Sequence, residues 1–253
     1  MLACIAGRGA HKVRLGCLPH DPVAVAAAPR HKFGAVMPPA VLDRSLIDLQ
    51  PGLYDNNTMP DCTAVALANY SRAVAAINGY QLALAAGKPL AFYAQCVGNP
   101  PNLAATDGAV MLDVLIRQST QGFDIGPEKL FGQWGTVQKS RTNLALAMSR
   151  FGAAYLGVTL RDRDMQTVGS VWDVATGRDD GPVVGGHAIM SFDYTGLADT
   201  DRVRVGTWGL WQPTTWRWLE ARLNEAYALV FRQLARADGF YNGVPASGIA
   251  DFL

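Results

Sequence analysis

Two halves of different character divide this sequence, and the division restricts the folds it can adopt. Before residue 151, apolar residues recur at helical spacing. Helices are expected at residues 62–84, 89–97, 108–119 and 141–151. After Gly152, short apolar segments alternate with turns rich in Gly and Asp. Strands are expected at residues 154–160, 188–194, 203–208, 214–218 and 226–231. Helices followed by strands are typical of an α+β protein and not of alternating βαβ units.

The chain is accordingly expected to hold one domain of two lobes, flanked by irregular ends. The domain spans residues 53–235, with a helical lobe at about 53–151 and an antiparallel β lobe at about 152–235. Residues 1–52 carry six prolines that interrupt every candidate helix, so this arm is expected to lie on the body of the protein. A peptidase pro-segment is the functional alternative for the arm. Residues 236–253 are expected to form a loose tail.

Composition and charge argue against several classes of function. Apolar residues make up 49% of the chain and charged residues 17%, which is typical of a globular protein. The net charge of +1 comes from 22 basic and 21 acidic residues without a basic run, so nucleic-acid binding is not expected. No apolar run is long enough to cross a membrane, and the N-terminus lacks the features of a secretory signal. A soluble protein is expected.

The four cysteines do not form a metal-binding pattern. They are Cys4, Cys17, Cys62 and Cys96, without a C-x-x-C pair and without clustered histidines. Mostly free thiols in a reducing compartment are expected, and neither a metal nor an organic cofactor is implied.

Cys62 is the first candidate for chemistry. It follows a loop rich in turn-forming residues, stands just after Asp61 as a candidate N-cap, and begins an Ala-rich helix that Asn78-Gly79 either ends or bends. Free N–H groups and partial positive charge at a helix N-terminus favour a thiolate and can stabilise an oxyanion. A buried structural cysteine is the simpler alternative.

His187 is the second candidate. It follows Gly185-Gly186 at the start of an apolar strand, 125 residues after Cys62, and is the only histidine beyond residue 31. A thiolate–imidazolium pair requires these two side chains within hydrogen-bond reach, which a cleft between two lobes can provide. A structural core histidine is the alternative.

Two further features have a structural and a functional interpretation. Trp208, Trp211, Trp216 and Trp218 crowd into eleven residues, which indicates packing on strands more readily than a carbohydrate-binding surface. His20 either fixes the arm to the domain or binds a partner.

Three motifs together resemble those of the papain-like cysteine peptidases. Asn56 lies six residues before Cys62, where the family has its oxyanion-hole glutamine. Gly186-His187-Ala188 matches the family's histidine strand, and Gly206-Thr207-Trp208-Gly209 resembles its Asn-Ser-Trp-Gly segment. The resemblance implies a two-lobed fold with the cleft between the helical and β lobes. It also implies that Cys62 is the nucleophile, His187 the base and Asn56 an oxyanion donor.

The sequence departs from the family at two positions. Asn56 is a shorter amide than glutamine, and Gly206 stands where the family has the asparagine that orients the histidine. Thr207, or a carboxylate such as Asp193, would have to hold the imidazole instead, while Trp208 would shield it from water.

A closer resemblance is to a papain-like subgroup encoded by tailed bacteriophages and prophages. Its motifs run from about residue 16 to 232 and include Leu-Pro-His-Asp-Pro, Asp-Cys-Thr, Gly-Gly-His-Ala and Thr-Trp-Gly. This implies a thiol hydrolase, a peptidase or amidase acting on protein or cell-wall peptide. The alternative is a virion structural protein, a capsid decoration or tail component with weak or no catalysis. Either protein would be made in the host cytoplasm, and the second would contact capsid or tail proteins.

Overall fold

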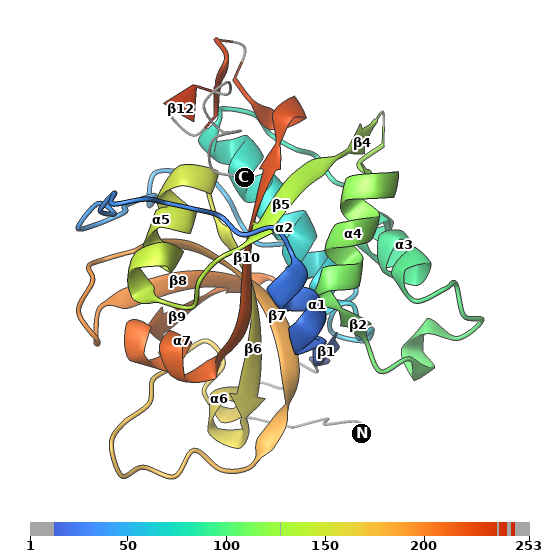
Figure 1. Ribbon diagram of the computed structural model, residues 1–253. Coiled ribbons are helices and arrows are strands. Elements are labelled where there is room, and N and C mark those ends of the chain that lie inside the picture. The colour runs from blue at the N-terminus through green and yellow to red at the C-terminus, as the bar shows by residue number, and fades with distance from the viewer. Residues whose placement is uncertain (1–12, 127, 237, 242–243, 246–253) are drawn as a thin grey trace.

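A six-stranded antiparallel sheet runs through the centre of the molecule (Figure 1). The computed structural model describes residues 13–126, 128–236, 238–241 and 244–245. The strand order is β5-β10-β6-β7-β8-β9. The strands are β5 Gly132–Thr136, β6 Ala154–Arg161, β7 Val183–Tyr194, β8 Arg202–Thr207, β9 Leu210–Thr215 and β10 Leu223–Phe231.

Short two-stranded ladders accompany this sheet. They are β1 Cys17–Leu18 with β2 Ala109–Val110, β3 Phe123–Asp124 with β4 Lys129–Leu130, and β11 Phe240–Tyr241 with β12 Val244–Pro245. The helices are α1 Pro22–Ala27, α2 Cys62–Ile77, α3 Gly87–Cys96, α4 Met111–Gln121, α5 Arg141–Phe151, α6 Asp162–Gln166 and α7 Trp216–Arg222. Single 3₁₀ turns occur at Leu103–Ala105 and Arg232–Leu234.

Helix α2 is the central element of the helical lobe. Thirteen of its sixteen residues are buried, as expected for a helix that is apolar or small on every side. Its many alanines let it pack closely on β7 and β6. The helix ends at Ile77 with Asn78 as its C-cap, after which Gly79 has a φ of +85° and Tyr80 N donates to Ala75 O at 2.9 Å. Asn78-Gly79 therefore ends the helix instead of bending it, in a glycine-dependent C-terminal motif.

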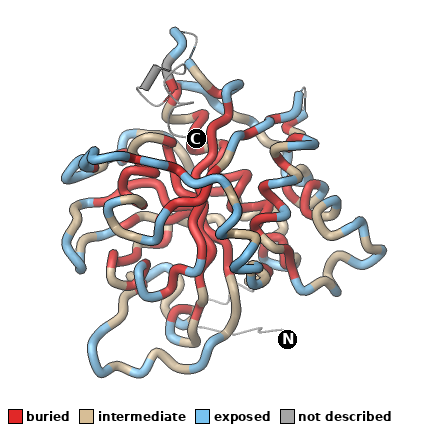
Figure 2. The backbone as a smooth tube through the Cα atoms, viewed as in Figure 1, coloured by how far each residue is buried: buried red, intermediate tan, exposed pale blue. Residues whose placement is uncertain are grey.

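Helix α5 shows how local signals fix an element. The Ser140 side chain accepts a hydrogen bond from Asn143 N at its start, and Gly152 follows its end with a φ of +92°. Its bounds are those expected from the sequence. Its apolar face joins the continuous core between the helices and the sheet, which Figure 2 shows as the buried centre of the tube.

The α+β class predicted from the sequence is confirmed, but several details of the sheet differ. Strand β7 begins at Val183, so His187 lies within the strand and not at its start. The strand expected at 214–218 is wrong in its second half, because the Thr215 side chain caps a helix that begins at Trp216. Strand β5 was not expected, yet it pairs with β10 in the main sheet. Because β5 precedes residue 152, this sheet takes one strand from the region expected to be helical.

The arm lies on the domain over its described part and contains one helix. Asp21 caps α1, and Pro22 occupies its first turn, where no backbone N–H is needed. The expectation that the prolines interrupt every helix here is therefore wrong. Farther along, Leu42 forms a β-bridge with Tyr194 at the end of β7.

The described part of the C-terminal segment includes a buried residue. Tyr241, within the stretch expected to be a loose tail, is fully buried and donates from its hydroxyl to Leu229 O at 3.4 Å. Most of the tail lies outside the described residues. Among the described residues, no helix combines the length and the apolar character that crossing a membrane requires.

Candidate functional site

The candidate nucleophile lies at the junction of the helical lobe and the sheet. Cys62 is the first residue of α2, packs toward β7, and is 1% exposed. Asp61 occupies the N-cap position, as expected, but its side chain forms no capping hydrogen bond. The N–H groups of the first turn are therefore left without that acceptor beside the thiol.

The imidazole of His187 is held from one side. His187 is fully buried on β7, and its Nε2 lies 2.6 Å from Thr207 Oγ1 on β8. Its Nδ1 has no hydrogen-bond partner among the described residues. One ring nitrogen is thus fixed by a hydroxyl, and the other is left for a proton or a thiol.

Strand alternation explains why Thr207 reaches the histidine and Gly206 does not. Neighbouring residues on a strand point to opposite faces. A Cβ added at Gly206 would lie 3.0 Å from Met190 Cε and 3.3 Å from Pro51 Cγ. A side chain at position 206 would therefore point away from His187. Asp193, the other residue considered for this contact, instead binds Arg204, with Nε 3.0 Å from Oδ1.

A tight turn places the indole of Trp208 over the imidazole. Thr207 pairs with Leu210, so only Trp208 and Gly209 connect β8 to β9. Their φ values are +46° and +76°, as a two-residue hairpin turn with two left-handed positions requires. The Trp208 ring stacks on His187 with centroids 4.2 Å apart and planes 21° apart. The left-handed tryptophan is strained, and it covers one face of the imidazole.

The predicted oxyanion donor is engaged elsewhere. Asn56 is buried, and its Nδ2 donates to Met59 O at 3.2 Å and to Arg14 O at 3.4 Å. The structure therefore places Asn56 in the loop before Cys62, with its amide holding the backbone of the arm.

Unsatisfied polar atoms concentrate around this site. Seven buried side-chain polar atoms in the described residues have no hydrogen-bond partner, and five of them belong to Asp61, Thr63, His187 and Trp208. Each such atom costs free energy, and native proteins keep few of them. Their concentration around Cys62 and His187 distinguishes this region from the rest of the described core.

Burial dominates the electrostatics of the candidate pair. It raises the pKa of the Cys62 thiol to about 12, against hydrogen bonding from the backbone of Ala188, Gly16 and Thr63. Burial also lowers the pKa of His187 to about 3. Burial thus outweighs the lowering of the thiol pKa that was expected from the helix N-terminus. Both groups are neutral at pH 7 in this structure. Because Ala188 follows His187 directly, its contact also places the thiol beside the histidine strand.

Within the described residues, the other cysteines and the carboxylates form no second centre. Cys17, Cys62 and Cys96 are free thiols, while Cys4 lies outside the described residues. Across the described part of the chain, His, Cys, Asp and Glu do not gather in a group of three suited to a metal ion.

The aromatic cluster and His20 have structural contacts. Trp208, Trp216 and Trp218 are buried, in agreement with packing. His20 Nδ1 lies 3.5 Å from Glu225 Oε1 at the start of β10, which fixes this part of the arm to the sheet.

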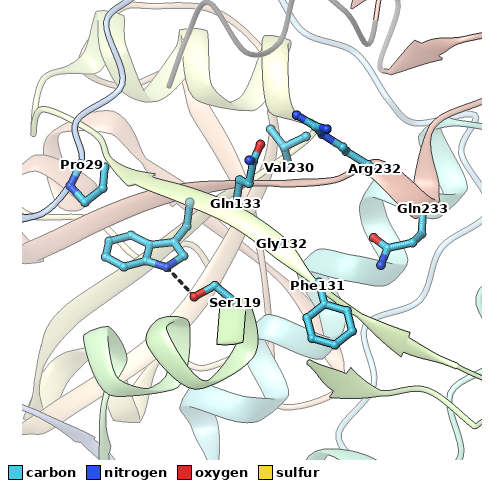
Figure 3. Close-up of a pocket in the computed structure, with 9 residues that line it drawn as sticks. Pro29, Ser119, Phe131, Gly132, Gln133, Val230, Arg232 and Gln233 are labelled. Carbon is cyan, nitrogen blue, oxygen red and sulfur yellow. Dashed lines mark hydrogen bonds between the residues drawn. The ribbon is translucent and has the colours of Figure 1, made fainter. Parts of the chain in front are cut away.

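A hollow of about 610 Å³ lies elsewhere, at the edge of the sheet (Figure 3). Phe131, Gln133 and Arg232 are among the residues that line it, and Trp134 Nε1 donates to Ser119 Oγ there at 3.4 Å. None of the predicted site residues lines this hollow, and its lining includes no cysteine or histidine.

The sheet, the buried helix packed on it and the lobe junction between them together form the papain-like α+β fold. Comparison with solved structures supports this assignment. No protein-family model and no curated protein matches the sequence.

Three cysteine-protease or procathepsin structures illustrate the similarity. Xylellain, a cysteine protease from Xylella fastidiosa, has a TM-score of 0.62 and 13% identity over 87% of this chain and 97% of its own. ProCathepsin B S9 from Trypanosoma congolense has a TM-score of 0.59 and 13% identity over 85% of each chain. Procathepsin L 3 from the larval midgut of Tenebrio molitor has a TM-score of 0.60 and 10% identity over 87% of this chain and 76% of its own. At these identities the similarity establishes the fold.

Sequence reasoning missed the residues of the arm that reach the site. Gly16 contacts the loop before Cys62, and Cys17 lies against Gly186. Their placement depends on pairing between residues 17–18 and 109–110, which leaves no local sequence signal.

Proposed function

We propose that this protein is a papain-like thiol hydrolase, a peptidase or amidase that uses Cys62 and His187. The observation that carries the proposal is the state of the His187 ring. Thr207 Oγ1 holds Nε2 at 2.6 Å, while Nδ1 is buried without a partner next to the strand residue that contacts the thiol. A base held at one nitrogen and free at the other is the arrangement that nucleophile activation requires.

The proposed chemistry assigns each residue one task. For Nδ1 to accept the thiol proton, Nε2 must carry the ring hydrogen and donate it to Thr207 Oγ1. The Cys62 sulfur then attacks an amide carbonyl, and the imidazolium protonates the leaving amine as the C–N bond breaks. Water hydrolyses the resulting thioester. The backbone N–H of Cys62 is the first candidate oxyanion donor, and Asn56 is the second.

Opening of the cleft to solvent would shift the pKa values of Cys62 and His187 in the directions that favour the thiolate–imidazolium pair. Burial is the leading cause of the raised pKa of Cys62 and of the lowered pKa of His187. Solvent entry reduces that contribution for both residues, so the thiol pKa falls and the imidazole pKa rises. Under this proposal, the neutral pair described above is the resting form of the site.

The shape of the pH profile for Cys62 alkylation tests this function. Iodoacetamide rates are measured from pH 4 to 9 by mass spectrometry, with Cys96 as the internal reference and His187→Ala in parallel. An ion pair is expected to keep Cys62 reactive below pH 7 in the wild-type protein and not in the variant. A Cys62 profile that rises only above pH 8 in both proteins contradicts the proposal. Cleavage of a peptide library, absent in Cys62→Ala, then identifies the substrate.

A second candidate is a virion structural protein on the same scaffold, a capsid decoration or tail component. The observation in its favour is that Cys62 and His187 are both almost completely buried. Its phage origin rests on the motif resemblance alone. Under this alternative the protein co-purifies with assembled particles and His187→Ala leaves Cys62 alkylation unchanged.

A further inference from the structure

The hollow at the sheet edge lies beside a strand that uses only one side of its backbone. In the β5–β10 ladder, Trp134 pairs with Leu229. The Leu229 N–H donates to the Tyr70 hydroxyl and the Leu229 C=O accepts from it, both at 2.9 Å, so these groups point away from β5. Opposed residues of an antiparallel ladder exchange both hydrogen bonds or neither. Trp134 and Leu229 exchange neither, and the N–H and C=O of Trp134 point to the outer side of β5.

The next outward-facing residue of β5 shows that this edge accepts an added strand. Thr136 lies two residues beyond Trp134, so its backbone faces the same side. Thr136 N donates to Pro29 O at 2.7 Å, and Thr136 O accepts from His31 N at 3.0 Å. These bonds form a parallel bridge between the arm and β5. Upstream of Pro29 the arm turns into helix α1, so it leaves the edge before it reaches Trp134.

Trp134 therefore presents an unpaired peptide unit to the hollow. Among the described residues, no hydrogen bond outside the β5–β10 ladder involves its backbone. Gly132, Trp134 and Pro29 all line the hollow, whose volume of about 610 Å³ is in the range of ligand-binding sites. Unpaired N–H and C=O groups on a sheet edge are a template for another extended chain. The groups that would recognise such a chain are thus already in place.

Side chains on the two faces of β5 restrict the sequence of that chain. Figure 3 shows Arg232 on one side of the β5 ribbon and Phe131 on the other. Phe131 is a large apolar residue that is 44% exposed. Arg232 is the one charged residue among the described residues of the lining, and it forms no ion pair within the described part of the chain. Successive side chains of an added strand alternate between the two faces, so an acidic residue would follow an apolar one.

We propose that the outer edge of β5 is a peptide-binding site, which takes an extended segment with an acidic residue beside an apolar one. The segment adds to the sheet as a short strand of about three residues. Its backbone pairs with Trp134, its carboxylate lies at Arg232 and its apolar side chain packs on Phe131. Neither Cys62 nor His187 lines the hollow, so the inference goes beyond the proposed hydrolase function and does not depend on it.

Hydrogen exchange of single backbone amides, followed by NMR on the full-length protein, tests the edge before any peptide is added. The Trp134 amide is expected to exchange about tenfold faster or more than the neighbouring Gly135 amide, which faces β10. Slow exchange of Trp134 in dilute protein would show that the edge is already covered and would overturn the inference. Protection of Trp134 that appears only at high protein concentration would assign the edge to a second copy of the chain, which also overturns it.

Synthetic peptides then test the occupant. The probe is the fluorescently labelled, end-blocked peptide Thr-Val-Glu-Val-Thr, and Thr-Val-Lys-Val-Thr is its charge control. Two further versions of the acidic peptide carry N-methyl groups on alternate residues, so that each version blocks one edge of the peptide strand. Binding is measured by fluorescence anisotropy in the Cys62→Ala background, which excludes cleavage of the probe. Arg232→Glu tests the charge contact, and Arg163→Glu, an exposed residue on α6, is the matched control.

The expected result combines charge and backbone dependence. Arg232→Glu weakens binding of the acidic peptide about fivefold or more and improves binding of the lysine peptide, whereas Arg163→Glu changes neither. One N-methylated version binds like the parent peptide and the other does not bind, because only one edge of an added strand pairs with β5. Saturation with the acidic peptide slows exchange of the Trp134 amide.

Three peptide results would overturn the inference. The acidic peptide fails to bind, or both N-methylated versions bind as tightly as the parent, which would mean that charge alone holds the peptide. In the third, the peptide binds but exchange at Trp134 is unchanged, which places the peptide elsewhere on the protein. A Cys62 alkylation profile that contradicts the hydrolase function leaves this inference in place, because none of these measurements involves the thiol.

Discussion

A hydroxyl group contacts the histidine in this protein, where the papain-like family has the amide of an asparagine. Thr207 Oγ1 contacts His187 Nε2 at 2.6 Å, one residue beyond the position that aligns with the family's asparagine. Side chains on a strand point alternately to its two faces. The residue that can hydrogen-bond to the ring is therefore the one whose side chain points toward it. The histidine can thus be oriented although position 206 is glycine.

Thr207→Val is expected to free the imidazole while it preserves the shape of the side chain. Loss of the hydrogen bond leaves a buried ring nitrogen unpaired and lowers the free energy of unfolding by about 1–2 kcal/mol. The low-pH reactivity of Cys62 is also expected to fall, because the ring loses its fixed tautomer. Urea unfolding and the alkylation profile measure the two effects. Thr207→Ser retains the hydroxyl and should stay near wild type in both; equal effects of the two variants would rule out the hydrogen bond.

Near the site, the buried carboxyl of Asp61 destabilises the folded protein when it is ionised. Burial raises the pKa of its carboxyl to about 7, although the nearby Asn56 amide acts to lower it. The folded protein therefore binds a proton that the unfolded chain has already released between about pH 4 and 7. Stability from this group is lost as the pH rises through that window.

Asp61→Asn is expected to stabilise the protein at high pH and much less at low pH. The amide removes the cost of an ionised buried carboxylate, which gives a gain of about 1–3 kcal/mol at pH 8 and little at pH 4. Urea unfolding at the two pH values measures the difference. Asp48→Asn, on the exposed arm, is the control. A gain that is equal at both pH values would show that ionisation of Asp61 is not its source.

At the scale of elements, the turn between β8 and β9 positions the tryptophan over the histidine. Gly209 has a φ of +76°, and a Cβ there would lie 2.9 Å from Leu53 Cβ. Gly177 has the same φ, but a Cβ there meets no atom within 4 Å. A comparison of substitutions at the two glycines therefore separates the cost of backbone strain from the cost of a packing clash.

Gly209→Ala is expected to destabilise the protein more than Gly177→Ala. Both variants pay the cost of a left-handed alanine, about 1 kcal/mol, and only the first adds a clash with Leu53 that brings its total to about 2–4 kcal/mol. Thermal or urea unfolding gives both values. The near-ultraviolet circular dichroism of Trp208 is expected to change in Gly209→Ala alone. Equal destabilisation would mean that the turn moves without resistance from Leu53.

Elements with local sequence signals were predicted more accurately than elements that depend on pairing with distant residues. The helix at 141–151 has a serine cap and a terminal glycine, and its bounds agree with the structure. The strand expected at 214–218 fails at Trp216, because the capping hydroxyl of Thr215 outweighs the aromatic pattern. Strand β5 was missed because Gly132 and Gly135 lower its strand propensity, and its pairing with β10 depends on residues about 95 positions away.

At the scale of the whole molecule, one buried arginine ties the arm to the domain. Arg44 donates to Phe192 O at 2.6 Å and to Met148 O at 2.9 Å, and it also binds Gly152 O. It thereby links the arm to β7, to α5 and to the turn between α5 and β6. Burial lowers the pKa of its guanidinium to about 10, which leaves it charged at neutral pH.

Arg44→Met is expected to weaken the folded domain as a unit. The substitution keeps most of the side-chain volume but leaves buried carbonyl groups unpaired, at a cost of about 2–4 kcal/mol. Urea unfolding followed by tryptophan fluorescence is expected to remain a single transition with a lower midpoint. Arg150→Met, on the partly exposed end of α5, is the control. A separate early transition would show that the arm unfolds independently of the sheet.

The candidate site could be predicted only where short motifs carry it. Cys62 and His187 stand next to recognisable local features, a helix start and a Gly-Gly pair. The packing of α2 on β7, which brings the two segments together, has no such local signal. To predict the contact of Thr207 with the ring, one must know which face of β8 each side chain points to. The pair Gly206-Thr207 does not show this in the sequence. The contact of Gly16 with the loop before Cys62 depends on parallel pairing of residues 17–18 with 109–110, across more than ninety positions of chain.

The parallel pairing of β1 with β2 has a consequence for biosynthesis. Ribosomes make the chain from its N-terminus, so Gly16, its partner strand β2 and the Cys62 helix all exist before His187 is added. Gly16 and the start of α2 can therefore associate while the histidine strand is still being synthesised. A nascent chain built in this order completes the helical side of the candidate site before His187 reaches it.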